Sequence, residues 1–336
     1  MPMTIISTNT LLRTLGFWRC PKLIDSIENA TLVIVWLNSI LLIPMKCKYA
    51  CRVLVAALFL VETCIAQTSS TPLWKTIPEV PAMPKADKSG LALVNDIKMY
   101  YAIFSDDGKE PVILIHGGFG SSDDWGFETP LLAKTHEVIV IDCRGRGRSS
   151  MSEQPFSYEL MTSDVLRLMD YLHIQKASII GESDGGIIGL IMAIRYPERI
   201  NKLLAFGANY NNTGYKSGPV DTASFARYIK MAETNYRKLS PTPEGFASMK
   251  SALFKMYASE PDIKPEELQI IVAPTVIADG EYEQFITLEH TKQLAHFIPG
   301  SKLLIIPNVS HGGPNQDPVS FHSAVIKLLN ENQKPI

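Results

Sequence analysis

Short apolar runs alternate along the chain with segments of helical spacing, and this pattern predicts the secondary structure. Strands are indicated by the runs "PVILIHG", "HEVIVID", "KASIIGES", "INKLLAF", "APTVIAD" and "SKLLIIP", each followed by polar or glycine residues. Residues 157–173 and 185–198 instead space their apolar side chains as amphipathic helices do. Apolar strands that alternate with helices predict an α/β fold, with a mostly parallel sheet covered on both faces.

Residues 211–271 interrupt this alternation. They contain two segments of amphipathic helical spacing with nothing strand-like between them, as an inserted helical cap would. The apolar residues of these helices are candidates to line a pocket under the cap, and packing the two helices together is the alternative role. They are Phe225, Tyr228, Phe246, Met249, Leu253 and Met256.

The amino end has the layout of a secretory signal. From Met45 the chain has a basic start, an apolar stretch over 53–61, and small residues up to Ala66. We therefore predict that residues 1–66 are an amino-terminal extension and signal peptide, with translation starting at Met45 and cleavage after Ala66. The mature protein would be exported, to the periplasm or outside the cell. The alternative is an uncleaved membrane anchor built from two apolar runs, residues 31–44 and 53–61, although each is shorter than the roughly 18 residues of a spanning helix.

The segment after the signal, residues 67–89, carries four prolines and no periodicity, which predicts a linker. The folded domain is then expected over 90–336. It begins with "LALVNDIKMYYAIF", which indicates two strands joined at an Asn95-Asp96 turn.

Charge, cysteine content and motif spacing argue against a nucleic-acid partner, a disulfide in the predicted domain and a metal site. The formal net charge is -2 and no basic stripe occurs, so no nucleic-acid partner is expected. Of five cysteines, only Cys143 lies after residue 66, so the predicted domain has no pair for a disulfide. No C-x-x-C pair and no His-x-x-x-His spacing indicates a metal site, and we expect neither metal nor cofactor.

The stretch "IIGESDGGIIG" places Ser183 between Gly181 and Gly185, where a predicted strand turns directly into a predicted helix. Such a corner forces its central residue into a strained conformation and requires small neighbours two positions away. This context predicts that Ser183 is a catalytic nucleophile rather than a loop serine.

Other chemically active residues follow the carboxyl ends of predicted strands, where sites form in open parallel sheets. His311 lies in a glycine-flanked loop directly after a late apolar strand, which makes it the candidate base for Ser183. His116 also follows a strand, and we interpret it as a structural residue. An acidic group runs from Asp279 to Glu283.

Four motifs in a fixed order, "HGGFGSSDDW", "DCRGRGRS", "GESDGG" and "NVSHGG", make the chain similar to the α/β-hydrolases over about residues 90–332. The resemblance implies an eight-stranded, mostly parallel sheet with an inserted cap. It also implies that the backbone N–H groups of Gly118 and Asp184 form the oxyanion hole.

The acid of the triad is predicted from spacing in the resembled family. After a strand beginning "PT", the family usually has a glycine and then an aspartate three residues later. Here Gly280 is followed at that spacing by Glu283. Asp279 is the alternative acid, because it has the usual chemistry but precedes the glycine.

These features predict an exported serine hydrolase that cleaves small, rather apolar carboxylic esters or lactones through an acyl-enzyme. Its partner would be a small-molecule ester substrate. Two alternatives stay open: a peptidase like the prolyl aminopeptidases, which "HGGFG" resembles, and a non-catalytic binding protein of this fold. The peptidase would need an acidic group to hold the substrate's amine.

Overall fold

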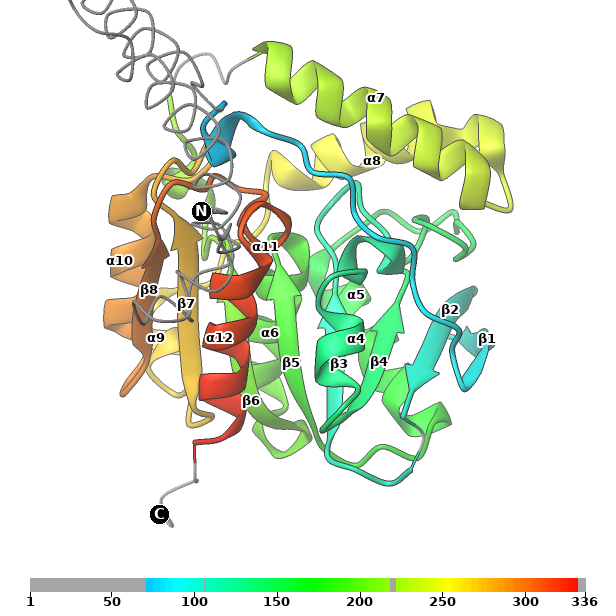
Figure 1. Ribbon diagram of the computed structural model, residues 1–336, viewed down its shortest axis with the longest axis horizontal. Helices are drawn as coiled ribbons and strands as arrows, with labels where there is room; N and C mark the ends of the chain where they lie inside the picture. Colours follow the sequence, from blue (N-terminus) through cyan, green and yellow to red (C-terminus); the bar gives the residue numbers. More distant parts are fainter. Residues whose placement is uncertain (1–70, 106, 218–221, 332–336) are drawn as a thin grey trace, which may run out of the picture. The chain divides into compact units, whose positions relative to one another are not determined.

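Eight strands form one sheet in the part of the chain that the computed structural model describes, residues 71–105, 107–217 and 222–331. Their spatial order is β1-β2-β4-β3-β5-β6-β7-β8, and β1 and β2 run antiparallel to their neighbours (Figure 1). In chain order the strands are β1 (Lys88–Val94), β2 (Ile97–Phe104), β3 (Pro111–Ile115), β4 (Glu137–Ile141), β5 (Ala177–Glu182), β6 (Ile200–Phe206), β7 (Thr275–Gly280) and β8 (Lys302–Ile306). The predicted α/β fold and mostly parallel sheet are confirmed.

Successive residues of the central strands point to opposite faces, and both faces are buried. On β3, Ile113 and Ile115 belong to one hydrophobic core, while Val112 and Leu114 belong to the other. A parallel strand covered on both faces needs apolar residues at every position, which explains the uninterrupted apolar run. All four of these side chains are at most 1% exposed.

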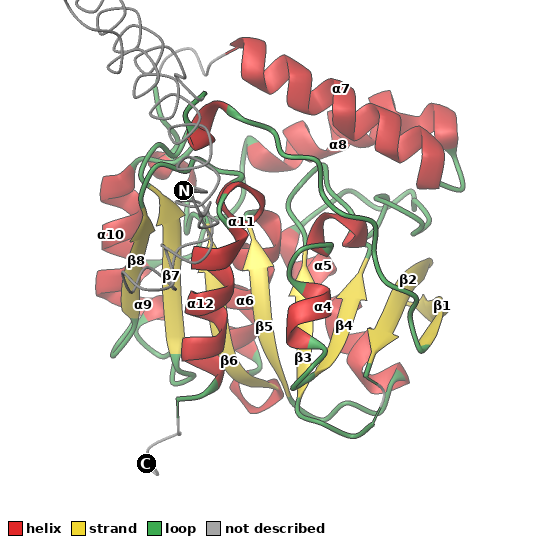
Figure 2. Cartoon of the chain, in the orientation of Figure 1, coloured by secondary structure: helices red, strands yellow, loops and turns green. Residues whose placement is uncertain are grey.

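Helices cover the two faces of the sheet (Figure 2). Apolar residues of α5 (Tyr158–Tyr171), α6 (Asp184–Arg195), α9 (Pro265–Leu268) and α10 (Leu288–Phe297) belong to the first core. Those of α4 (Thr129–Leu132) and α12 (Pro318–Leu329) belong to the second. The short α11 (Gly313–Gln316) precedes α12. Among the described residues, no helix is both long and apolar enough to cross a membrane.

Two helices lie over the end of the sheet toward which β5 and β7 point, as the predicted cap requires (Figure 1). They are α7 (Thr222–Leu239) and α8 (Phe246–Tyr257), joined through a 3-10 turn at Pro243–Gly245. Of the predicted pocket residues, Phe225 and Tyr228 do line a cavity. The other four, Phe246, Met249, Leu253 and Met256, are instead buried in the first core.

The proline-rich segment before β1 is packed against the domain, whereas the sequence predicted a linker over 67–89. Trp74 stacks on Tyr282 with ring centroids 4.8 Å apart, a contact worth about 0.5–1.5 kcal/mol beyond buried area. Gln316 donates a 2.9 Å hydrogen bond to the carbonyl of Thr76. Met83 and Ala86 pack against the second core. We call residues 71–87 the strap.

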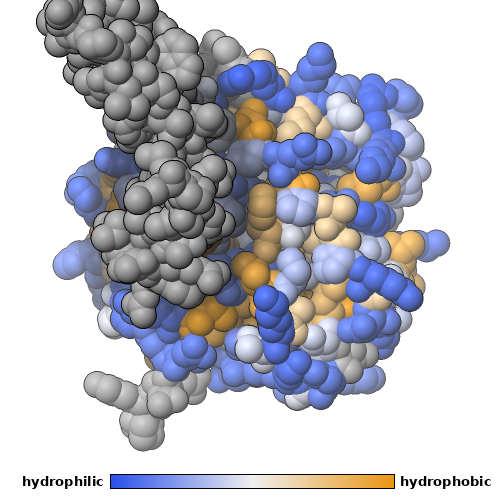
Figure 3. Space-filling model, in the orientation of Figure 1, coloured by the Kyte–Doolittle hydropathy of each residue, from blue (hydrophilic) through white to orange (hydrophobic). Residues whose placement is uncertain are grey.

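The strap starts near the cap and runs across one face of the domain to β1 (Figure 1). Coloured by hydropathy, that face has hydrophilic residues around most of its margin and hydrophobic residues between them (Figure 3). Residues 1–66, which include the predicted signal peptide, lie outside the described residues.

Candidate active site

Ser183 stands at the corner between β5 and α6 with φ 51° and ψ -114°. Left-handed values of this kind cost a non-glycine residue on the order of 1–3 kcal/mol, which the surrounding structure must supply. The Ser183 N–H donates to the carbonyl of Phe206 on the neighbouring strand at 2.7 Å. At Gly185 a Cβ would lie 2.1 Å from the carbonyl oxygen of Ile115, so only glycine fits. The predicted strand–turn–helix geometry is therefore present.

His311 and Glu283 form a close pair in which the carboxylate is buried and the imidazole is partly exposed. Nδ1 of His311 lies 2.7 Å from Oε2 of Glu283, and the Glu283 side chain is fully buried. The other carboxylate oxygen accepts the backbone N–H groups of Phe285 and Ile286, at 2.6 and 3.3 Å. The carboxylate is thus fixed from both sides, and it orients the imidazole with an Nδ1–H toward itself.

Electrostatics favour an ionised pair at this position. Burial lowers the pKa of His311, but the charge and hydrogen bond of Glu283 outweigh it and raise the pKa to about 9. Burial raises the pKa of Glu283, but the charge and hydrogen bond of His311 outweigh it and lower the pKa to about 2. Glu283 is therefore a carboxylate at neutral pH, as a partner that stabilises an imidazolium must be.

Asp279, the alternative acid, lies beside this pair with different hydrogen-bond partners. One of its carboxyl oxygens accepts the N–H of Gly280 at 2.8 Å, and the other accepts the hydroxyl of Thr291 at 2.7 Å. Its side chain is fully buried, and burial together with the charge of Glu283 raises the pKa of Asp279 well above its usual value. The structure thus brings Glu283, and not Asp279, onto the imidazole.

The predicted oxyanion groups lie next to the serine. A Cβ on Gly117 would stand 3.3 Å from Cβ of Ser183, so the loop after β3 approaches the corner closely. Asp184 is the first residue of α6, a position whose N–H has no acceptor within the helix. Gly118 and Asp184 line the same cavity as Ser183, where their N–H groups can serve a developing oxyanion.

His116 has the structural role that the sequence indicated. Its Nε2 accepts the backbone N–H of Cys143 at 3.0 Å, and its Nδ1 lies 2.6 Å from the carbonyl of Gly117. Burial is the main cause that lowers the pKa of His116 to about 3, so the ring is neutral. It ties the loop after β3 to the loop after β4.

Ser183 and His311 open onto one cavity of about 390 Å³, which we call the main cavity. Its wall is largely aromatic and includes Tyr158, Phe225, Tyr228, Phe254, Tyr257 and Phe285. A mostly apolar wall with a few convergent polar groups is typical of a site for a small organic ligand.

Three further residues of the site were not predicted from the sequence. The Tyr158 and Tyr257 hydroxyls donate to the carboxylate of Asp184, at 2.8 and 3.1 Å. Glu182, the residue before the predicted nucleophile, also lines the main cavity. The only signal for Glu182 was an acidic residue inside the glycine–serine–glycine corner.

Comparison with known proteins agrees with this geometry. Residues 110–262 match the family model described as alpha/beta hydrolase fold. The 3-oxoadipate enol-lactonase 2 of Acinetobacter baylyi is 27% identical over 263 residues, covering 70% of this chain and 94% of that protein. Serine hydrolase BPHL of Mus musculus is 29% identical over 235 residues, covering 66% and 80%.

Among solved structures, Est816, an N-acyl homoserine lactone degrading enzyme, is 26% identical with a TM-score of 0.56, covering 69% of this chain and 98% of that one. The fold, the motifs and these matches show that the chain has the α/β-hydrolase fold.

Proposed function

We propose that this α/β-hydrolase is a serine hydrolase that cleaves small carboxylic esters or lactones. The observation that carries the proposal is the Glu283–His311 pair, whose imidazole lines the same cavity as a serine on a strained corner. Glu283 keeps the imidazole in the tautomer that can accept a proton at Nε2.

The reaction would proceed in two halves. Ser183 Oγ attacks the ester carbonyl carbon while His311 Nε2 takes the hydroxyl proton, and the N–H groups of Gly118 and Asp184 stabilise the alkoxide. One such donor typically lowers the barrier by about 3 kcal/mol. Collapse of the intermediate expels the alcohol, which takes the proton from His311. Water then attacks the acyl-enzyme by the same route and releases the acid.

The substrate class follows from the cavity and from the relatives. A largely aromatic cavity of about 390 Å³ suits a small substrate with an apolar body. Two of the similar proteins are described as an enol-lactonase, a name that denotes cleavage of a cyclic ester, and as an enzyme that degrades N-acyl homoserine lactones.

A series of nitrophenyl esters of increasing acyl length, with lactones and prolyl arylamides beside them, tests this proposal. We expect turnover of the esters and lactones that exceeds turnover of the arylamides. Arylamide cleavage without ester cleavage would instead support the peptidase alternative. Absence of any hydrolysis by the folded protein would support a binding function.

The pH dependence of hydrolysis is a second expected result. Because His311 must be neutral to accept the serine proton, and its pKa is raised to about 9, kcat/KM should rise with pH through that value. Initial rates from pH 6 to pH 10, corrected for spontaneous hydrolysis, measure this. A profile already flat above pH 7 would contradict a charged Glu283–His311 pair in the free enzyme.

We also propose that the enzyme is exported, on the support of the signal-like layout from Met45 to Ala66. The mature protein would then begin near Gln67, just before the strap. Amino-terminal sequencing of active protein purified from the native host tests this. Active protein that retains residues 1–44 would contradict it.

A further inference from the structure

Glu182 lies on a wall shared by two cavities beside Ser183. One is the main cavity. The other has a volume of about 120 Å³ and is bounded on one side by strap residues such as Trp74 and Thr76, and we call it the strap cavity. Both cavities are also lined by His311, so a group bound near Glu182 stands within the reacting region. A Cβ on Gly117 would lie 3.9 Å from the carboxyl carbon of Glu182, which places that carboxyl beside the oxyanion loop.

Two other carboxylates around these cavities have a cationic neighbour. Glu283 has His311 at 2.7 Å, and Asp184 has Arg146 at 4.0 Å as well as its two tyrosine hydroxyls. The carboxylate of Glu182 has neither a hydrogen bond nor an ion pair with the side chain or backbone of any described residue, and only the backbone of Glu182 is paired, in β5. Because a half-buried carboxylate without partners is unfavourable, this group has capacity to bind a donor or a cation.

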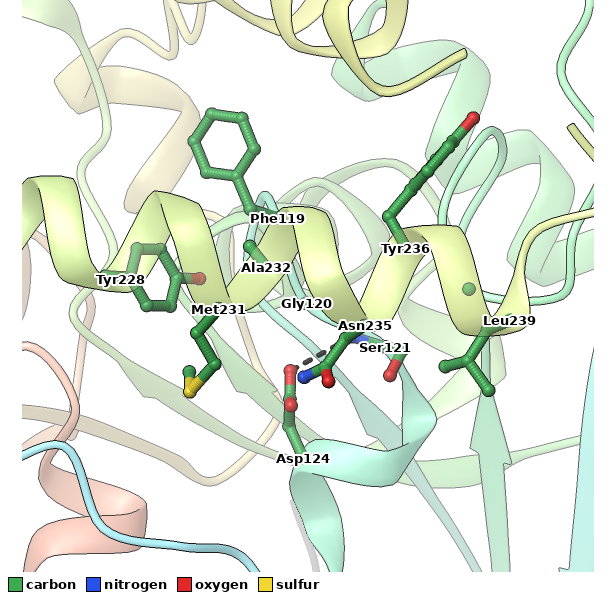
Figure 4. Close-up of a pocket in the computed structure, with 11 residues that line it drawn as sticks. Phe119, Gly120, Ser121, Asp124, Tyr228, Met231, Ala232, Asn235, Tyr236 and Leu239 are labelled. Carbon is green, nitrogen blue, oxygen red and sulfur yellow. Dashed lines mark hydrogen bonds between the residues drawn. The ribbon is translucent and has the colours of Figure 1, made fainter. Parts of the chain in front are cut away.

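Two further carboxylates, those of Asp124 and Glu283, act electrostatically on Glu182. Asp124 also lines the strap cavity, where its carboxylate accepts the N–H of Ser121 at 3.0 Å. Figure 4 shows the Asp124 side chain directed toward α7, near Met231 and Asn235. Among the described residues that line the main cavity there is no lysine or arginine, whereas the strap cavity is lined by Lys75, whose Nζ lies 4.6 Å from the centroid of the Trp74 ring.

The titration of Glu182 agrees with this environment. Burial raises the pKa of Glu182 to about 7, the positive charge of His311 opposes the shift, and the charges of Asp124 and Glu283 add to it. A bound cation would offset the repulsion and hold Glu182 in its ionised form.

Aromatic walls add a second attraction for positive charge. Phe225, Tyr228 and Phe285 line both of the cavities that Glu182 lines, and the faces of such rings attract ammonium groups. A carboxylate together with aromatic rings is a common way for a protein to hold an alkylammonium group. The same wall also accepts the apolar body of an ester.

We propose that Glu182 determines substrate specificity, by binding a positively charged amine or alkylammonium group on the ester while Ser183 attacks its carbonyl. The inference rests on the proposed hydrolase function and narrows its substrate class. The preferred substrates are esters with an apolar frame and one positive charge, on either the acyl or the alcohol side.

Two pairs of isosteric substrates test this proposal. The first is a nitrophenyl ester whose acyl chain ends in trimethylammonium, against the one that ends in tert-butyl. The second is acetylcholine against dimethylbutyl acetate. We expect the wild type to prefer the charged member of at least one pair, measured as the kcat/KM of the charged substrate divided by that of the neutral one. Glu182→Gln should reduce this ratio about tenfold to a hundredfold. Glu182→Asp, which keeps the charge, should retain part of the preference.

Glu289→Gln is the matched control, because it removes the same charge from a side chain that is 70% exposed on α10. Its ratio should equal that of the wild type. The preference for the charged substrate, measured as the ratio of the two kcat/KM values, should also grow between pH 6 and pH 8 as Glu182 ionises. Both substrates depend in the same way on the protonation of His311, so that dependence cancels in the ratio. A ratio unchanged in Glu182→Gln for both pairs would overturn the inference.

Binding of choline and of dimethylbutanol to Ser183→Ala separates this inference from the proposed function. The first possible result is that the wild type hydrolyses no ester, but Ser183→Ala binds choline more tightly than dimethylbutanol. If adding Glu182→Gln to Ser183→Ala then removes this difference in affinity, only the hydrolase proposal fails. The opposite result has three parts: the neutral esters are hydrolysed, neither substrate pair shows a preference for the charged member, and choline and dimethylbutanol bind equally well. That result would support the hydrolase proposal and reject the role of Glu182.

Discussion

Ser183→Ala is expected to lower ester turnover about 10⁶-fold, the loss found when the nucleophile of a serine protease is removed. The substitution removes the hydroxyl, which is the proposed nucleophile, and removes no other group. Alanine keeps a Cβ and can occupy the same corner between β5 and α6, where φ is 51°. The measurement is kcat for a chromogenic ester, with thermal unfolding recorded on the same sample. A fluorophosphonate probe should label the wild type and not the variant.

Ser178→Ala is the matched control for this experiment. Ser178 lies on the same strand, is fully buried, and its hydroxyl has no hydrogen-bond partner among the described residues. Its loss should therefore leave both labelling and turnover intact. Turnover that survives in folded Ser183→Ala would show that another residue carries the reaction.

The corner at Ser183 was predictable because its sequence signals are local, although the structure also fixes it through Ile115 and Phe206 on neighbouring strands. An apolar strand, two small residues and a helical repeat all lie within a few positions of the serine. The sheet was also predictable from local signals, because a strand that is buried on both faces has a continuous run of apolar residues in the sequence. Pairing His311 with Glu283 required the spacing known from a family, because those residues lie on different loops.

The lining of the cap could not be read from periodicity alone. Helix α8 is apolar on two adjacent sides. One side carries Phe246, Met249, Leu253 and Met256, which enter the core. The other carries Phe254 and Tyr257, which line the main cavity. Helical spacing identifies such faces but does not say which of them meets the core and which meets the cavity.

The position of Glu182 in the site and the packing of the strap against the domain were not predicted, for a related reason. Isolated acidic residues and proline-rich segments are usually exposed, so sequence reasoning assigns them to the surface by default. Here the strap is held by partners far along the chain, such as Tyr282 and Gln316. The setting of Glu182 depends likewise on Asp124 and His311, which only the folded sheet brings near it.

Glu283→Gln is expected to lower kcat about 10⁴-fold, as the equivalent amide substitution does in a serine protease. In the structure, one carboxylate oxygen of Glu283 accepts two backbone N–H groups and the other faces Nδ1 of His311. The amide oxygen of glutamine would keep the backbone contacts, which leaves its NH₂ group facing the ring. His311 must then present an unprotonated Nδ1, and the proton moves to Nε2, the atom that has to receive the serine proton.

Asp279→Asn, measured beside it, should stay within about tenfold of wild type, because the carboxyl of Asp279 contacts Gly280 and Thr291, whereas the imidazole of His311 is held by Glu283. An asparagine there can still accept the N–H of Gly280 through its oxygen, and its NH₂ group can donate to the hydroxyl oxygen of Thr291. Thermal unfolding of both variants separates loss of catalysis from loss of fold. Collapse of the asparagine variant while the glutamine variant stays near wild type would assign the acid to Asp279.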